Sequence, residues 1–246
     1  MNQKLALQLQ QWFVSKPGQA LWQYEQHRIE PTLTQTFGYL AIQVGLPQIN
    51  FLANSPIQKK LIVASFGESS HSAPYPCIQA QAYQLPLQEQ SVDLLILPHT
   101  LEYHEESEAI LREAHRVLIN EGKLIILGFN PLSLSGLCQF YRKEELSPIP
   151  LKQQISQRKL KDWVKLVGFE LEHTSQPYSE PKKPLSLKTA WLEMDKGVYV
   201  INARKRSVGI RLVGSVISKQ KKVPQQVPVL TSSSLNSKHI SQKNSS

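Results

Sequence analysis

The sequence predicts an α/β fold: an open, mostly parallel, Rossmann-like sheet with helices on both faces and a late antiparallel strand pair. Two observations lead to this prediction. The first is the continuous apolar run SVDLLILP at 91–98, which is typical of a strand that is covered on both faces. The second is the helical pattern at 105–118 followed by another apolar strand at 123–129. Strand, helix and strand within about forty residues indicate a βαβ unit with a right-handed crossover.

Weaker patterns precede this unit. Short runs typical of strands lie at 39–45, 59–66 and 76–82. The connection between the first two contains two prolines and leaves room for a short helix at best. Residues 17–37 show helical spacing at Leu21, Tyr24 and Arg28, and Pro31 is expected to break or restart this helix.

The segments that follow the helix at 105–118 complete the predicted fold. Gly122 is expected to end that helix. A further helical pattern includes Leu160, Trp163 and Val164 and should stop at Gly168. Two final strands are predicted at 169–174 and 197–203.

Charge divides the chain into three parts. The net charge of +9 comes from 28 basic and 19 acidic residues, and nine of the basic residues, with no acidic ones, lie from Arg204 onward. We therefore expect an N-terminal helical lid at 1–38, an α/β domain at 39–203 and a basic, disordered tail at 204–246. The tail could contact nucleic acid or an acidic surface weakly, although a solubilising extension is the simpler interpretation.

Composition favours a cytoplasmic protein. Cys77 and Cys138 are too few for a disulfide framework and lack the spacing of a metal site. The chain has no apolar run of the about 20 residues that a membrane helix needs, and its first residues do not resemble a signal peptide. No membrane partner is expected.

Polar residues follow two strands of the predicted sheet. His99 and Glu102 come directly after the strand at 91–97, and Asn130 follows the strand at 123–129. Because ligands of open parallel sheets bind at the carboxyl ends of the strands, we expect these three side chains to face one cleft.

Each of these residues also has a simpler interpretation. His99 could be a hydrogen-bonded structural histidine, and Glu102 could cap a helix that begins near Glu105. His104 and Glu106 are expected in a solvated loop. The two histidines lie five positions apart with no cysteine nearby, so no zinc site is expected. No Walker loop, serine elbow or Cys–His nucleophile motif is present either.

The stretch at 85–131 resembles the second half of a class I S-adenosylmethionine-dependent methyltransferase of type 11. The matching residues, in order and spacing, are Leu85-Pro86, Asp93, Leu101-Glu102, LREAHRVLINEG and KLIILG. A bacterial group of methyltransferase-like proteins is more similar still, and the residues shared with it are Pro98-His99, Leu101-Glu102, 128–131, Ser133 and Gly136-Leu137. The resemblance covers roughly residues 17–213 and is most specific in the centre.

This resemblance implies a seven-strand sheet that binds S-adenosylmethionine. Gly45 matches the family's glycine-rich turn, in which Leu46 and Pro47 stand where further glycines are usual. The degraded turn implies a weaker or differently placed cofactor. The other implied cofactor contacts are Glu68 at the ribose, Gln81 beside Ala82 at the adenine amine, and His99 at the end of the fourth strand.

The leading functional expectation is methyl transfer to an unidentified acceptor. His99 is the candidate general base, with Glu102 or Asn130 orienting the reactants. A non-catalytic, methyltransferase-like binding or regulatory protein is the alternative, because the glycine turn is degraded. A nucleic-acid-modifying enzyme steered by the basic tail is a third reading.

Overall fold

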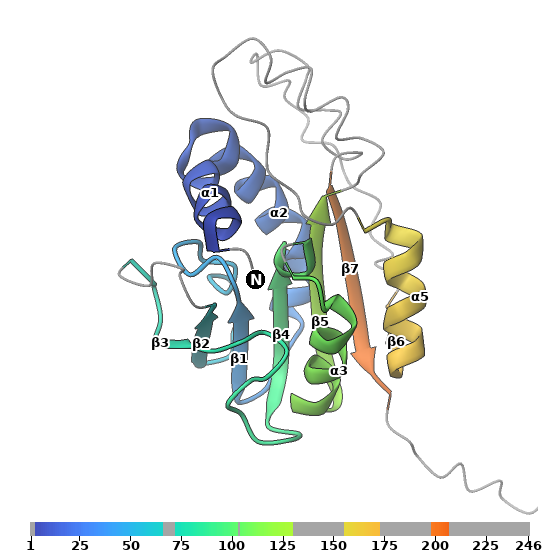
Figure 1. Ribbon diagram of the computed structural model, residues 1–246. Helices are drawn as coiled ribbons and strands as arrows, with labels where there is room; N and C mark the ends of the chain where they lie inside the picture. Colours follow the sequence, from blue (N-terminus) through green and yellow to red (C-terminus); the bar gives the residue numbers. More distant parts are fainter. Residues whose placement is uncertain (1–2, 66–71, 103, 130–154, 173–197, 207–246) are drawn as a thin grey trace, which may run out of the picture. The chain divides into compact units, whose positions relative to one another are not determined.

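A computed structural model describes residues 3–65, 72–102, 104–129, 155–172 and 198–206 (Figure 1). Its helices are α1 Gln3–Val14, α2 Lys16–Thr34, the short 3₁₀ helix η1 Thr100–Glu102, α3 Ser107–Val117 and α5 Gln157–Val167. Its strands are β1 Leu40–Val44, β2 Lys59–Ala64, β3 Cys77–Gln79, β4 Val92–Pro98, β5 Leu118–Phe129, β6 Phe169–Leu171 and β7 Val198–Lys205.

The seven strands form one sheet in the order β3-β2-β1-β4-β5-β7-β6. The first five are parallel to one another, and β7 runs antiparallel to both β5 and β6. The predicted fold class is therefore confirmed, including the late antiparallel pair. No helix joins β1 to β2, as the prolines between them indicated.

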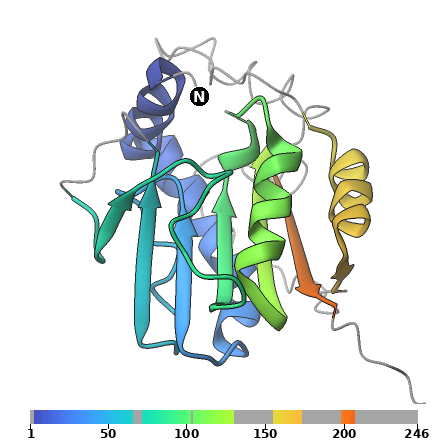
Figure 2. The ribbon, with the colours of Figure 1, turned by 60° about the horizontal axis from the view of Figure 1, so that its bottom comes forward.

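Helices lie on both faces of the sheet (Figure 2), and each face is covered by an apolar layer. Successive side chains of a strand point to opposite faces. On one face, α1 and α2 pack on Ala41, Leu94, Ile96, Ile125 and Leu127. On the other, α3 and α5 pack on Ile42, Val44, Leu95, Leu124 and Ile126. Burial on both faces explains the continuous apolar character of β4 and β5.

The helix α2 differs from its prediction at Pro31. It runs through Pro31 to Thr34, because Ile29 and Leu33 are fully buried against the sheet and hold the last turn in place. Burial of two such side chains, at about 2 kcal/mol each, offsets the about 3 kcal/mol that a helical proline costs. Of the three spaced residues, Leu21 is buried, whereas Tyr24 is only partly buried against the apolar layer and accepts a hydrogen bond from the partly buried Arg28.

The helix α3 ends at Val117, and Leu118 already begins β5. The predicted stop at Gly122 is therefore wrong. What ends the helix is the side chain of Lys205, whose Nζ donates to the carbonyls of His115 at 2.7 Å and Leu118 at 2.8 Å. Gly168 does end α5, with the positive φ of 107° that glycine accommodates.

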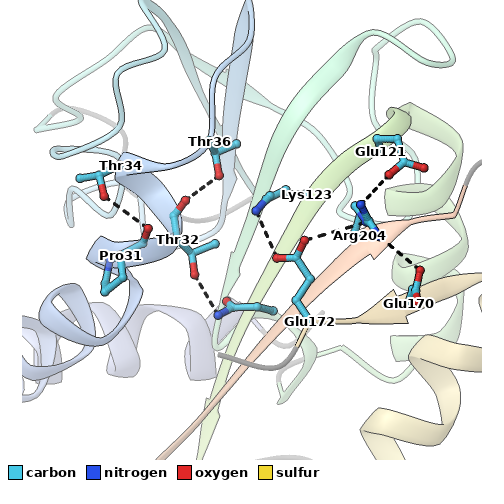
Figure 3. A network of polar contacts seen from close by, with 10 residues as sticks. Pro31, Thr32, Thr34, Thr36, Glu121, Lys123, Glu170, Glu172 and Arg204 are labelled. Atoms are coloured by element: carbon cyan, nitrogen blue, oxygen red, sulfur yellow. Dashed lines mark hydrogen bonds and ion pairs between the residues drawn. The ribbon is translucent and has the colours of Figure 1, made fainter. Parts of the chain in front are cut away.

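The late strand pair is held by charged side chains (Figure 3). Arg204 lies 2.9 Å from Glu121 and 3.4 Å from Glu170, and Lys123 lies 3.2 Å from Glu172. The strand β7 therefore extends to Lys205, and two residues assigned to the tail belong to the sheet. Residues 207–246 lie outside the described residues, so the disordered tail stays a prediction.

The segment LREAHRVL at 111–118 has a structural role. Glu113 accepts a hydrogen bond from the backbone N–H of Leu85 at 2.7 Å, and Arg116 donates to the Leu85 carbonyl at 3.1 Å. Burial would raise the pKa of Glu113, but the hydrogen bonds from Arg116 and Leu85 lower it. The pair thus fixes the Leu-Pro segment against α3.

Candidate active site

The first five strands end at one edge of the sheet, because they are parallel. The side chains that follow β1, β3 and β4 therefore gather at this carboxyl edge, the usual ligand-binding edge of such sheets. In Figure 1, α1 and the first part of α2 lie beyond this edge. The residues of the predicted N-terminal lid form these two helices, and their role as a lid stays a prediction.

His99 is the first residue beyond β4. Its φ of 53° turns the chain sharply away from the strand, and its N–H still donates to the Leu127 carbonyl of β5 at 2.9 Å. The next residue, Thr100, donates its hydroxyl to the Val44 carbonyl at 2.6 Å. These bonds fix the imidazole between the ends of β5 and β1.

Two glutamates flank the His99 ring. Nε2 lies 2.8 Å from Oε1 of Glu25 on α2, and Nδ1 lies 3.2 Å from Oε2 of Glu102 in η1. The other Glu102 oxygen accepts a short hydrogen bond from the Phe129 N–H. All three side chains are buried. His99 and Glu102 lie together in this buried cluster, and Asn130 lies outside the described residues, so the cleft expected to be shared by all three stays a prediction.

Aromatic rings enclose this cluster. The His99 ring lies 4.2 Å from the Phe129 ring and 5.4 Å from the Phe13 ring, measured between centroids. Trp12 packs edge-on against both phenylalanines. Because α1 supplies Trp12 and Phe13, the N-terminal helices exclude water from the carboxyl end of β4.

The surroundings of His99 favour its charged form. Burial would lower the pKa of His99, but the charge of Glu25 and the hydrogen bonds from Glu102 and Glu25 outweigh burial and raise the pKa to about 10. With a carboxylate at each ring nitrogen, both nitrogens act as donors. A doubly protonated ring cannot accept a proton, so this geometry does not support His99 as the general base.

Two neighbouring expectations need correction. Glu102 does not cap α3, which begins at Ser107 and has no side-chain hydrogen bond at its N-cap Glu106; Glu102 bonds to Phe129 and His99 instead. Burial raises the pKa of Glu102. His104 is not solvated either: it is buried, and burial lowers its pKa to about 4. Glu105 and Glu106 are exposed, as expected, so the expectation is wrong only for His104.

Glu25 was not among the residues predicted from the sequence. Its position in the helix is nevertheless informative, because Leu21, Ile29 and Leu33 are buried at four-residue intervals and Glu25 occupies the remaining position of the same stripe. An acid in an apolar stripe of a helix requires a buried partner. That partner, His99, lies 74 positions away and could not be identified from local spacing.

A second missed residue, Gln43, organises the turn after β1. Its Nε2 donates to the carbonyls of Gly45 at 3.1 Å, Leu46 at 3.0 Å and Ile49 at 2.8 Å. Its Oε1 accepts from the Phe51 N–H at 3.1 Å. One fully buried amide therefore holds the turn that stands where the methyltransferase family carries its glycine-rich loop.

The predicted cofactor residues Gly45 and Ala82 have structural roles. Gly45 has a φ of 89°, and a Cβ there would lie 3.1 Å from the Thr100 hydroxyl. Its N–H donates to the Val63 carbonyl. Leu46 and Ala82 are buried in the two apolar layers. The turn therefore offers less to a cofactor than a glycine-rich loop would.

Gln81 does fit the adenosine end of S-adenosylmethionine. It follows β3 at the carboxyl edge, and its Oε1 is buried without a hydrogen-bond partner among the described residues. A buried acceptor of this kind requires a donor, and the adenine amine is one. Glu68, the predicted ribose contact, lies outside the described residues.

A polar hollow of about 510 Å³ lies between α3 and α5. It is lined by Glu105, Glu106, Ser107, Glu108, Ala109, Arg112, Ile155, Lys159 and Trp163. The predicted site residues do not line it. Within the described stretches, no group of three or more histidines, cysteines and acids is arranged to hold a metal ion, and no helix is long and apolar enough to span a membrane.

Comparison with known proteins places this fold and site in a family. Residues 52–126 match the model of the methyltransferase domain. The uncharacterised protein YafS of Escherichia coli strain K12 is 31% identical over 199 residues, covering 80% of both chains.

Solved structures agree on the fold. YcgJ of Bacillus subtilis aligns with a TM-score of 0.55 at 14% identity over 75% of this chain and 99% of its own. An S-adenosylmethionine-dependent methyltransferase of Mesorhizobium loti aligns with a TM-score of 0.56 at 14% identity over 72% of this chain and 96% of its own.

The sheet order, the domain match and the likeness to solved structures agree on the class I methyltransferase fold. The chain belongs to the family that contains YafS, and its residues 52–126 carry a methyltransferase domain. The turn at Gly45–Phe51, built on Gln43, is its main departure from the glycine-rich pattern.

Proposed function

We propose that this chain binds S-adenosylmethionine at the carboxyl edge of its sheet and transfers the methyl group to an acceptor whose identity is open. The observation that carries the proposal is the buried, partnerless Oε1 of Gln81 on the same edge as His99. In the family resemblance, Gln81 stands at the adenine amine and His99 beside the cofactor. A cytoplasmic location is part of this proposal.

Different residues at the carboxyl edge of the sheet would bind the cofactor, exclude water and position the reactants. Gln81 would hold the adenine amine, with Gly45, Ala82 and Glu68 as the other proposed contacts. When bound, the cofactor supplies a methyl group on a positively charged sulfur. The Trp12 and Phe13 rings would keep water from the reacting atoms. Glu102, Asn130 and a protonated His99 would position the reactants, because orientation in a dry site supplies much of the rate of such a displacement.

Calorimetric titration of the full chain with S-adenosylmethionine and S-adenosylhomocysteine tests the proposal. We expect saturable binding of both, and binding weaker by about tenfold in Gln81→Leu, which cannot accept the amine hydrogen bond. Gln84→Leu is the matched control, because Gln84 is exposed three residues away. Lack of binding at millimolar concentration of either compound would instead favour the non-catalytic alternative.

A further inference from the structure

The cluster of Glu25, His99 and Glu102 suggests how the site distinguishes its cofactor from the product. We propose that this cluster is a buried counter-ion that binds the positively charged methyl donor in preference to the neutral thioether left after transfer. This inference rests on the proposed function and adds a specificity role for Glu25. It would also assist product release, because the attraction ends when the positive charge leaves the sulfur.

The charge count of the cluster is the first step. Two carboxylates flank a single imidazolium, at 2.8 Å and 3.2 Å. The side chains of Glu25, His99 and Glu102 are 0%, 0% and 1% exposed, respectively. With both carboxylates ionised, one negative charge is in excess where water cannot solvate it, and the same burial raises the pKa of Glu102. The cluster therefore requires either a proton or a cation.

Among the described residues, the hydrogen bonds leave one carboxylate oxygen of the cluster without a donor. Both oxygens of Glu102 face N–H donors, one from His99 and one from Phe129. Oε1 of Glu25 faces His99, whereas Oε2 is buried and has no hydrogen-bond partner among the described residues. Tyr199 of β7 lies in the field of Glu102, but burial raises its pKa, so its phenol is neutral and adds no charge. Oε2 of Glu25 is therefore the oxygen that a proton or a cation would contact.

The position of the cluster directs this charge toward the cofactor edge. His99 follows β4 directly, and Thr100 bonds to the end of β1, so the cluster lies at the edge where the proposed function places the methyl donor. The rings of Phe13 and Phe129 enclose the cluster and keep the local dielectric low, which strengthens the attraction between charges. A sulfonium has no hydrogen to donate, so charge is the property that separates it from the thioether.

The test compares the affinities of the full-length protein for S-adenosylmethionine and S-adenosylhomocysteine by calorimetry. We expect wild type to prefer the charged donor by on the order of tenfold. Glu25→Gln should remove most of this preference and keep the shape of the side chain. Glu30→Gln is the matched control, because it removes the same charge from the same helix at a side chain that is 43% exposed. It should keep the preference.

The outcomes separate the inference from the proposed function. An unchanged preference in Glu25→Gln, with both compounds still bound, would overturn the counter-ion role and leave methyl transfer standing. Failure of wild type to bind either compound would remove both.

Wild type also provides a measurement that does not depend on how Glu25→Gln folds. If the donor replaces a proton on the cluster, its binding near pH 7 should release a proton, which titrations in two buffers of different ionisation enthalpy detect. Binding of the thioether should release none. Equal affinities without proton release would overturn the inference.

Discussion

Nε2 of His99 and Oε1 of Glu25 lie 2.8 Å apart, although 74 positions separate them in the sequence. This contact joins the end of β4 to the N-terminal helix α2, so the lid and the sheet edge share one buried ion pair. Removing one member of such a pair leaves the other charge buried without its partner.

Glu25→Ala should therefore destabilise the protein. We expect the free energy of unfolding to fall by about 3 kcal/mol, measured by urea denaturation at pH 7. Glu30→Ala on the exposed side of the same helix should change it by less than about 0.5 kcal/mol. Equal effects of the two substitutions would mean that the Glu25–His99 contact does not hold the lid.

The charged state of His99 predicts a stability that depends on pH. Because the folded pKa is raised from 6.5 to about 10, the contribution of His99 is fully present below about pH 6.5 and is lost as pH rises through about 10. The difference in unfolding free energy between wild type and His99→Gln should shrink across this window, by at most about 1.4 kcal/mol per pH unit. Glu102, whose folded pKa is also raised, acts in the same direction. A difference that grows toward pH 10 would contradict a protonated His99.

His104 predicts the opposite dependence. Its folded pKa is lowered to about 4, so its contribution is present above about pH 6.5 and is lost as pH falls through about 4. Wild type should lose stability between pH 6.5 and 4, and His104→Gln should lose less. His27→Gln, at a side chain that is 68% exposed, serves as control. Urea midpoints at pH 7, 5 and 4 check this, and identical acid profiles for wild type and His104→Gln would refute it.

Gln43 predicts a local effect at the turn after β1. Gln43→Leu removes the side-chain partner of the Gly45 and Ile49 carbonyls and of the Phe51 N–H, whereas the Leu46 carbonyl keeps the Ile49 N–H, so we expect a loss of about 2–4 kcal/mol. Hydrogen exchange of the Phe51 amide should rise with it. Gln48→Leu in the same turn is only partly buried and should have little effect. If the Phe51 amide stays as protected as in wild type, the turn is held by something other than Gln43.

The sheet could be predicted from the sequence because its signals are local. The apolar run of β4, the helix α3 and the strand β5 each carry their own pattern, and prolines between β1 and β2 exclude a long helix. The ends of the helices were harder to predict where residues distant in the sequence determine them. Lys205 ends α3 from the far end of the chain, and burial carries α2 through Pro31.

The site was predicted only in part for the same reason. The ends of two strands predicted that His99, Glu102 and Asn130 would face one cleft, but not that aromatic rings from α1 would enclose His99. The ionisation of His99 depends on Glu25, which is brought to it by the packing of α2. In the sequence, Gln43 is an ordinary polar position of an alternating strand. Only the folded turn brings the Ile49 carbonyl to its side-chain amide.

A crystal structure with S-adenosylhomocysteine tests the central claim most directly. The account predicts an adenine amine within hydrogen-bond distance of Gln81 Oε1 and a sulfur beside the end of β4 near His99. A nucleoside bound instead in the hollow between α3 and α5, or a protein that stays free of the compound at millimolar concentration, would contradict it.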